Sequence, residues 1–438
     1  MRAPLSRVSC RPGSAPSNDR PRSCSILSRP FSALKFLLLN QAFYPDVVST
    51  AQHLQTVALE LVRRGHEVTV ISSRRAYDHP GRKFPAFECW RGIHIYRVNS
   101  TGFGKAAKWR RAVDFGSFIL GCAVRMLLLP RHDAILALTS PPLISFLGAC
   151  LSVLQRRRFF YWVMDFNPDE AIAAGWLRPG SPVTRVLEWM SLFSFRRATK
   201  IIALDRFMHE RIVAKGIAAE KIVTIPPWSH DDEISFDPDG RARFRQAHGL
   251  DGKFVVMYSG NHSPCHPLET LLQAAEGLLD QPEIVFYFVG GGSEFHKIKQ
   301  KAFASGGGTQ PGANLRCLPY QPLSELSGSL SAADLHVVVM GDPFVGLVHP
   351  CKIYNILAVG SPVLCIGPRP SHLSELLDSL GDHSHAIVSH GDVAQVRTAI
   401  VQLREQTRNH RTRPPAPAGL SHRQESALPK FVGILEAC

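Results

Sequence analysis

The chain has 438 residues, of which 45% are hydrophobic and 20% are charged, and it carries a formal net charge of +14. This length predicts two or three globular domains, and the composition excludes a wholly disordered chain. The positive charge is compatible with nucleic acid, an anionic membrane surface or polyanionic substrates, and it does not distinguish these partners. The ten scattered cysteines include no CxxC pair, which favours a reduced, cytoplasmic protein over a disulfide-bonded one.

The amino-terminal segment 1–34 is rich in serine, proline and arginine and has no hydrophobic periodicity. Such a composition predicts a disordered basic extension. The first apolar run, 36–39, is too short for the core of a signal peptide and continues directly into a folded pattern. We therefore expect the folded protein to begin near Lys35.

From there onward, short apolar runs alternate with amphipathic runs. Strand-like runs at 36–39 and 67–72 flank a helix-like pattern at 51–63. The repetition of this unit to about Ile225 predicts a parallel sheet with helices on both faces. Because ligands in such sheets bind beyond the carboxyl ends of the strands, the loop 41–50 is a candidate wall of a binding site.

Two apolar stretches, 113–129 and 134–154, are long enough to raise the question of transmembrane helices. Charged residues interrupt the first stretch, and Pro141 and Pro142 divide the second, so membrane spans are not expected. We interpret both stretches as containing helices that pack against the sheet. With the arginine run 156–158, they could instead rest on an anionic membrane surface.

The run 159–168, FFYWVMDFNP, predicts an aromatic strand that ends on Asp165. A carboxylate at that point lies on the ligand side of a parallel sheet, where it can act as a base or hold a hydroxyl group. The alternative is a helix-capping or loop residue. Asp169 and Glu170 follow and are expected to open a helix, where acidic side chains are favourable.

A polar run that follows Trp228 marks a domain boundary. The expected segments are an amino-terminal domain (35–228), a linker (229–251), a carboxyl-terminal domain (252–404), a flexible segment (405–425) and a terminal helix (426–438) that docks elsewhere on the fold. In the linker, Asp237 and Asp239 have the DxD spacing of metal-bridged sugar diphosphates. Since they flank a proline and precede a glycine, we interpret them as a turn and predict no metal site.

Within the second domain, small and polar residues follow the first two predicted strands. They are Gly260, Asn261 and His262 in one predicted loop, and Gly290, Gly291 and Gly292 in the next. These residues and segment 342–352 could line one crevice. A G-x-G-x-x-G motif followed by an acidic residue is absent from the sequence, which weakens a nicotinamide or flavin interpretation.

The segment 342–360, DPFVGLVHPCKIYNILAVG, follows a run of valines and predicts a strand, a glycine-containing loop and a helix that opens at Pro350. Unpaired backbone N–H groups at the start of the helix, with Lys352 one turn in, would attract an anion, and the expected anion is a phosphate. The alternative is an ordinary strand–helix unit in which Lys352 is solvated.

Six segments together resemble one known family. They are NQAFYPD (40–46), LVRRGHEVTV (61–70), VMDFNPDEAIAAGWL (163–177), YSGNHSPCHPLETLLQAA (258–275), FVGGGSE (288–294) and HPCKIYNILAVGSPVL (349–364). In this order they resemble the GT-B glycosyltransferases of the GT4 type, particularly bacterial enzymes of exopolysaccharide (colanic-acid-like) and O-antigen assembly. The resemblance covers roughly residues 35–404.

The resemblance implies two Rossmann-like, doubly wound parallel-sheet domains that face a central cleft, with the acceptor on the first and a nucleotide-sugar donor on the second. The implied donor-binding residues are Gly260, Asn261, His262, Gly291, Tyr320, Asp342, Gly346, Pro350, Cys351, Lys352 and Asn355. Asp165 would lie near the acceptor hydroxyl as the catalytic residue. The chemistry would need neither a metal nor a cofactor, because helix dipole and cation neutralise the leaving diphosphate. Many relatives carry glutamates where this chain has Leu347 and Asn355.

The implied activity is a hexosyl or N-acetylhexosaminyl transfer from a UDP-sugar, or a similar donor, to a polyprenyl-diphosphate-linked or saccharide acceptor, with retention of configuration. The protein is expected in the cytoplasm, with peripheral association on the inner face of the plasma membrane as an alternative. Alternatives are a nucleotide-sugar epimerase or phosphorylase of the same fold, or a non-catalytic basic membrane or nucleic-acid binder. Nucleic acid is not the expected partner, because the aromatic residues are not interleaved with basic ones.

Overall fold

The computed structural model describes residues 33–77, 81–102, 108–228, 234–304, 314–409 and 424–437. The predicted basic extension 1–34 therefore lies almost entirely outside the described residues. The first part of the predicted linker and most of the predicted flexible segment 405–425 also lie outside them.

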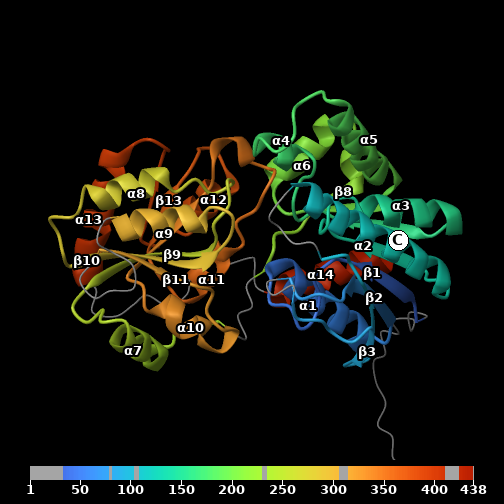
Figure 1. The fold of residues 1–438 in the computed structure, drawn as a ribbon, viewed down its shortest axis with the longest axis horizontal. Helices are drawn as coiled ribbons and strands as arrows, with labels where there is room; N and C mark the ends of the chain where they lie inside the picture. Colours follow the sequence, from blue (N-terminus) through green and yellow to red (C-terminus); the bar gives the residue numbers. More distant parts are fainter. Residues whose placement is uncertain are drawn as a thin grey trace, which may run out of the picture. The chain divides into compact units, whose positions relative to one another are not determined.

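Two sheets organise the described chain (Figure 1). The first has eight strands in the order β3-β4-β2-β1-β5-β6-β7-β8, and the second has six in the order β11-β10-β9-β12-β13-β14. Neighbouring strands are parallel, except that β3 pairs antiparallel with β4 at the edge of the first sheet. The sequence did not predict this edge strand.

The strands of the first sheet are β1 (Lys35–Leu39), β2 (Glu67–Ser73), β3 (Phe87–Trp90), β4 (Ile93–Val98), β5 (Ala134–Ala137), β6 (Arg158–Trp162), β7 (Lys200–Ala203) and β8 (Ile222–Thr224). Those of the second are β9 (Phe254–Asn261), β10 (Ile284–Gly291), β11 (Leu315–Leu318), β12 (Leu335–Val339), β13 (Val363–Ile366) and β14 (His385–Val388).

Between the strands of the first sheet lie the helices α1 (Ser49–Arg63), α2 (Lys108–Leu128), α3 (Ile144–Gln155), α4 (Asp169–Ala173), α5 (Pro182–Arg197), α6 (Arg206–Ala214) and the 3-10 turn η1 (Ala219–Lys221). The later helices are α7 (Pro238–Ala247), α8 (Glu269–Glu276), α9 (Phe295–Ala304), α10 (Leu323–Ser331), the 3-10 turn η2 (Asp342–Phe344), α11 (Lys352–Ala358), α12 (His372–Asp378), α13 (Val393–Asn409) and α14 (Gln424–Ala437).

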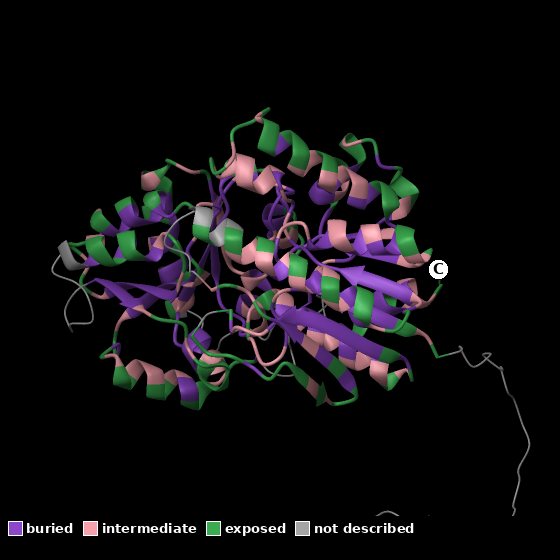
Figure 2. Ribbon diagram, turned by 45° about the vertical axis from the view of Figure 1, so that its right-hand side comes forward, coloured by how far each residue is buried: buried purple, intermediate pink, exposed green. Residues whose placement is uncertain are grey.

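The predicted pair of doubly wound α/β sheets is confirmed. Central strands such as β5 and β12 are buried at every position, which is typical of parallel strands covered by helices on both faces. Figure 2 shows the same contrast, since the strands are largely buried while the helices alternate buried and exposed positions. The apolar runs that suggested strands in the sequence thus form the interior of both sheets.

The two long apolar stretches form α2 and the β5–α3 unit. Helix α3 contacts β1, β5 and β6, and α2 contacts β2 and β4, so the prediction that these helices pack against the sheet is confirmed. Among the described residues, no helix combines the length and the apolar character needed to cross a membrane.

Two local predictions around the strand ends are wrong. Strand β6 ends at Trp162, and Asp165 lies three residues beyond it, in a turn closed by a hydrogen bond from the Asn167 backbone N–H to the Asp165 carbonyl (3.1 Å). The Val163 N–H still donates to the Ile202 carbonyl of β7 (2.9 Å), but the Phe166 N–H donates to the Leu347 carbonyl (2.9 Å), away from the neighbouring strands. Asp165 is therefore a loop residue beyond the strand.

Conversely, Gly260 and Asn261 belong to strand β9, not to the loop predicted for them. Gly260 and Gly290 both have φ of +135°, and a Cβ atom on Gly290 would lie 2.0 Å from the Gly260 carbonyl oxygen. Only glycine at these paired positions lets β9 and β10 continue side by side.

The DxD spacing forms the start of a helix instead of the predicted turn. Asp237 is the N-cap of α7, where its Oδ1 accepts a hydrogen bond from the Gly240 backbone N–H (2.8 Å), and Pro238 occupies the first helical turn. This arrangement is a common helix start, so the first carboxylate is already engaged in capping.

The carboxyl-terminal helix α14 packs on the core of the first sheet. It contacts α1, and the Phe431 ring lies 4.3 Å from the Trp162 ring and 6.1 Å from that of Trp228. Glu436 accepts a hydrogen bond from Arg64 Nη1 (2.8 Å), and its other carboxylate oxygen lies 2.8 Å from His66 Nε2. The prediction that a terminal helix docks elsewhere on the fold is confirmed.

Candidate active site

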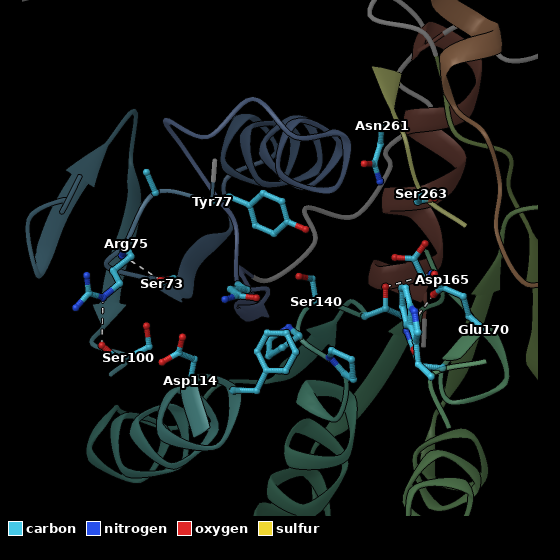
Figure 3. A pocket seen from close by; sticks show the side chains of 18 of the residues that line it. Ser73, Arg75, Tyr77, Ser100, Asp114, Ser140, Asp165, Glu170, Asn261 and Ser263 are labelled. Carbon is cyan, nitrogen blue, oxygen red and sulfur yellow. Dashed lines mark hydrogen bonds between the residues drawn. The ribbon is translucent and has the colours of Figure 1, made fainter. Parts of the chain in front are cut away.

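A pocket of about 300 Å³ lies beyond the carboxyl ends of the first sheet's strands, as the fold predicts. Its lining residues are Gln41, Ser73, Arg75, Ala76, Tyr77, Ser100, Gly102, Asp114, Phe115, Thr139, Ser140, Pro141, Pro142, Asp165, Asn167, Glu170, Trp176, Asn261 and Ser263. The last two belong to the second sheet's region, where Asn261 ends β9 and Ser263 follows it. Figure 3 shows Asp165 and Glu170 near Asn261 and Ser263, with Arg75, Ser100 and Asp114 at the other end.

Asp165 is held in the pocket by its backbone. Its N–H donates to the Thr139 hydroxyl (3.2 Å), which ties the loop after β6 to the loop after β5. Burial raises the pKa of the Asp165 carboxyl to about 6. The Asp165 carboxyl therefore changes its charge close to neutral pH.

Glu170 is a second carboxylate at this end of the pocket. It accepts hydrogen bonds from the Asn167 side chain (3.4 Å) and from the Cys265 thiol (3.5 Å), which comes from the second sheet's region. The sequence predicted only that Glu170 opens a helix, which it does in α4. Its spacing of five residues from Asp165 was the available signal for a role in the site.

Lys352 lies against the second sheet and is largely enclosed. Its ammonium group donates to the Tyr258 hydroxyl (2.6 Å) and lies 3.8 Å from the centre of that ring. Burial lowers the pKa of Lys352 to about 7. None of the ion pairs formed between described residues includes Lys352. An enclosed cation without a carboxylate partner is costly unless an anion binds beside it.

Gly260 makes room for this lysine. A Cβ atom on Gly260 would lie 3.1 Å from Lys352 Cε, so a larger residue would press on the side chain. Tyr258 was missed as a site residue because an aromatic residue in a buried strand looks like core in the sequence. Its hydroxyl donates to the Asn261 carbonyl (2.8 Å) and thereby links Lys352 to the pocket wall.

The predicted helix start at Pro350 is wrong. Helix α11 begins at Lys352, with Cys351 as an N-cap whose side chain makes no capping hydrogen bond, and it is only seven residues long. Pro350 is buried in the loop before it. Because the helix is so short, the argument for an anion rests on the Lys352 charge and no longer on a helix dipole.

Gly346 sets the path of this loop. Its φ is +71°, and a Cβ atom there would lie 2.7 Å from the Phe207 backbone at the start of α6. The loop is thus seated on the first sheet's region, where the Arg211 guanidinium also donates to the Val345 carbonyl (2.7 Å). Leu347 is buried in the first sheet's core, so this position serves packing.

The remaining predicted donor residues occupy three different environments. Gly291 pairs with Asn261 and lies under the half-exposed Tyr320, whose ring would be 3.0 Å from a Cβ atom on that glycine. Asp342 is exposed in η2, and Asn355 is half-buried on α11; neither lines the pocket.

His262 is fully buried and does not line the pocket either. Its ring lies 4.8 Å from that of Tyr258 and 4.7 Å from that of Phe295. Burial, with the nearby Lys352 charge, lowers the pKa of His262 to about 4, so the imidazole is neutral at pH 7.

A buried polar network that the sequence did not reveal joins the two regions. Asp205 accepts a hydrogen bond from His349 Nδ1 (2.8 Å), and His349 Nε2 lies 2.7 Å from the Tyr354 hydroxyl. Burial would raise the pKa of Asp205, but its bonds to His349 and the Met208 backbone lower it to about 2. His372 completes the cluster at 3.6 Å from Asp205.

These three side chains bring possible metal ligands within 4.8 Å of one another. However, the His349 and His372 rings are stacked with centroids 4.1 Å apart and planes 20° apart, so their nitrogen lone pairs lie in nearly parallel planes and cannot converge on one ion. We therefore interpret the hydrogen bonds of His349 with Asp205 and Tyr354, with His372 stacked on His349, as a network that fixes the loop before Lys352.

Comparison with known proteins agrees with this geometry. Residues 49–228 match the family described as "Glycosyl transferase 4-like domain". This segment is similar to glycosyl transferase 4-like domains. The chain is 24% identical over 358 residues to the putative colanic acid biosynthesis glycosyl transferase WcaI of Escherichia coli, covering 79% of this chain and 86% of that protein. It is 26% identical to the probable glycosyltransferase WbjE of Pseudomonas aeruginosa, over 57% of this chain and 61% of that protein.

Solved structures show the same architecture. Anabaena Alr3699/HepE, solved in complex with UDP and glucose, aligns with a TM-score of 0.67 at 17% identity, covering 92% of this chain and all of that one. The sucrose-phosphate synthase of Thermosynechococcus elongatus aligns with a TM-score of 0.69 at 12% identity, over 92% and 98% of the two chains. The fold is therefore GT-B, and the resemblance drawn from the sequence is confirmed.

Proposed function

We propose that this glycosyl transferase 4-like protein transfers a sugar from a UDP-sugar to a lipid-linked or saccharide acceptor in the cytoplasm, during assembly of a cell-surface polysaccharide. The observation that carries the proposal is Lys352, an enclosed cation without a carboxylate partner among the described ion pairs. It lies beside Gly260, and the Tyr258 hydroxyl links it to the Asn261 carbonyl. That arrangement suits a diphosphate. The names of WcaI and WbjE and the UDP bound to Alr3699/HepE support the donor class and the pathway.

In the proposed reaction, the bond between the anomeric carbon and the β-phosphate oxygen breaks, and a bond to the acceptor oxygen forms on the same face of the sugar. The acceptor hydroxyl proton passes to the departing diphosphate oxygen. Lys352 neutralises the charge that develops on this diphosphate, which is the role a metal has in other enzymes. Asp165 accepts a hydrogen bond from the acceptor hydroxyl and orients it.

The donor assignment is tested by titrating UDP into the purified protein and into Lys352→Ala by calorimetry. We expect the substitution to weaken UDP binding at least about 30-fold, since it removes a charge-assisted contact in an enclosed site. A matched control is Lys299→Ala, an exposed lysine on α9, which should bind UDP like the wild type. Equal affinities of Lys352→Ala and wild type would refute the phosphate assignment.

The reaction class is tested by measuring UDP release from a panel of UDP-sugars with and without a polyprenyl-diphosphate-linked saccharide. A transferase releases UDP in proportion to acceptor. Conversion of the donor without acceptor would instead identify an epimerase. Unchanged turnover in excess chelator supports the proposed metal independence, whereas complete loss of turnover contradicts it.

A further inference from the structure

Three neighbouring helices expose large apolar side chains to solvent. They carry about half of the exposed large hydrophobic residues of the described chain. These are Val113, Leu120, Val124, Leu127 and Leu128 on α2, Val153 and Leu154 on α3, and Val183, Val186 and Trp189 on α5. Concentrated exposure of this kind marks an interaction surface.

The three helices form one continuous surface, which we call the α2–α3–α5 face. Helix α3 contacts both α2 and α5. Between α3 and α5, the Phe146 ring lies 5.7 Å from the Trp189 ring and 5.4 Å from the Phe193 ring. The three helices that carry the exposed apolar residues are therefore neighbours, with α3 in contact with the other two.

Helix α2 is apolar on its outer side as well as on its inner side. Phe118, Cys122 and Met126 are buried against the sheet, whereas Leu127 and Leu128 are 64% and 73% exposed. A surface helix normally places polar residues on the side away from the core. The outer apolar residues of α2 are thus left exposed by the other described parts of the fold.

Helix α5 reverses the usual pattern. Its buried positions include Thr184, Ser191 and Ser194, and Ser191 satisfies its hydroxyl by donating to the Asn167 carbonyl (3.0 Å). Its outer side carries Trp189, which is 59% exposed. Small polar residues inside and apolar residues outside are typical of a helix whose outer side meets an apolar medium.

The charges at the edge of this face are mostly positive. Arg156 follows α3, Arg185 lies on α5, and Arg196 and Arg197 end α5; all four are exposed. Glu188 is the single acidic residue in the sequences of α3 and α5. An apolar patch edged by arginine and including an exposed tryptophan complements the headgroup region of an anionic bilayer.

We propose that the α2–α3–α5 face docks on an anionic phospholipid bilayer, with the helices lying parallel to the membrane plane. Residues next to each helix line the pocket: Asp114 and Phe115 on α2, Pro142 before α3 and Trp176 before α5. Docking would therefore hold the pocket at the level of the headgroups, where the diphosphate of a lipid-linked acceptor lies. Only this last consequence rests on the proposed function.

The test is co-sedimentation of the full chain with vesicles of phosphatidylcholine, alone or mixed with about one third phosphatidylglycerol. We expect binding to the anionic vesicles only, weakened by salt. Arg196→Gln/Arg197→Gln should lower the partition coefficient about 30-fold, from about 1 kcal/mol for each charge near the surface. Leu127→Gln/Leu128→Gln should lower it about tenfold or more.

Matched controls change the same residue types on the second sheet's region. One control is Leu279→Gln, because Leu279 is 56% exposed in the wild type. The other is the double variant Arg243→Gln/Lys299→Gln, at two exposed basic residues. Both should sediment like the wild type, and every variant should keep the wild-type circular dichroism and UDP affinity.

Three outcomes would overturn the proposal: no sedimentation of the wild type, equal losses in the controls and in the variants of the face, or a wild-type dimer that Leu127→Gln/Leu128→Gln converts to a monomer. The last would show that a second copy covers the face. If the wild type does not bind UDP, the proposed function is contradicted, whereas membrane docking is still decided by the sedimentation experiment.

Discussion

Replacing Lys352 with methionine should make the protein more stable while abolishing its affinity for UDP. Burial moves the pKa of Lys352 from 10.5 to about 7. At about 1.4 kcal/mol for each pKa unit, enclosing the charge costs at most about 5 kcal/mol. The lost hydrogen bond to Tyr258 offsets about 1 kcal/mol of the gain, and partial solvation reduces it further, so we expect a net stabilisation of about 2–4 kcal/mol at pH 6.

The pH dependence gives the sharper readout. Between pH 7 and about 10.5 the unfolded state holds the Lys352 proton and the folded state does not, so wild-type stability gains from Lys352 as pH rises. Below pH 7 the full cost of the buried charge is present. The advantage of Lys352→Met should therefore be largest at pH 6–7 and shrink toward pH 9. Melting temperatures of both proteins across this range provide the measurement.

Two control variants separate this explanation from general packing effects. Lys352→Arg keeps a charge at every pH, so it should lack the rise in stability above pH 7. Lys299→Met, at an exposed position, should stay within about 0.5 kcal/mol of the wild type at every pH. A Lys352→Met advantage that does not change between pH 6 and 9, or a variant less stable than wild type at pH 6, would refute the reasoning.

Three further predictions follow from the site and the core. Asp165→Asn should lower kcat about 100-fold with unchanged UDP affinity. The kcat of the wild type should fall as pH drops below about 6, because the Asp165 carboxylate is then protonated. If the kcat of Asp165→Asn stays within threefold of the wild-type value, Asp165 has no role in catalysis. Gly346→Ala should lower the free energy of unfolding by about 2–3 kcal/mol and weaken UDP binding. Gly391 also has a positive φ, but nothing lies within 4 Å of a new Cβ atom, so Gly391→Ala should lower it by only about 1 kcal/mol. Equal losses of the two variants in chemical denaturation would contradict the close contact of Gly346. Phe431→Ala should cost about 3–5 kcal/mol, against less than about 1 kcal/mol for the exposed Phe236→Ala; a small loss for Phe431→Ala would mean that α14 is not part of the core.

The sequence was sufficient for the architecture because local patterns carry it. Apolar runs with β-branched residues, such as Val337 to Val339, are buried strands in any parallel sheet. The same logic located Asp165 on the ligand side, although the strand stops three residues earlier. Strand ends depend on contacts such as that of Phe166 with Leu347, which lie 181 positions apart by residue number and leave no local trace.

The candidate site was harder to predict from the sequence, because it also depends on contacts between residues far apart along the chain. Lys352 could be singled out, but its enclosure depends on Tyr258, which looks like a core residue in the sequence. The link between Asp205 and His349 spans 144 positions. Pro350 suggested a helix start, but it lies in the loop before α11. The close contact of Gly346 with Phe207 and the buried network around His349 hold this loop in place.

Transfer itself is the most direct test of the account. Radiolabelled UDP-sugars would be incubated with the full chain and a polyprenyl-diphosphate-linked saccharide, and the lipid product would be analysed for label and for anomeric configuration. The account predicts labelled product of retained configuration with the wild type, and at least about 100-fold less with Asp165→Asn or Lys352→Ala. Labelled product formed equally well by both variants would contradict the assignment of the site.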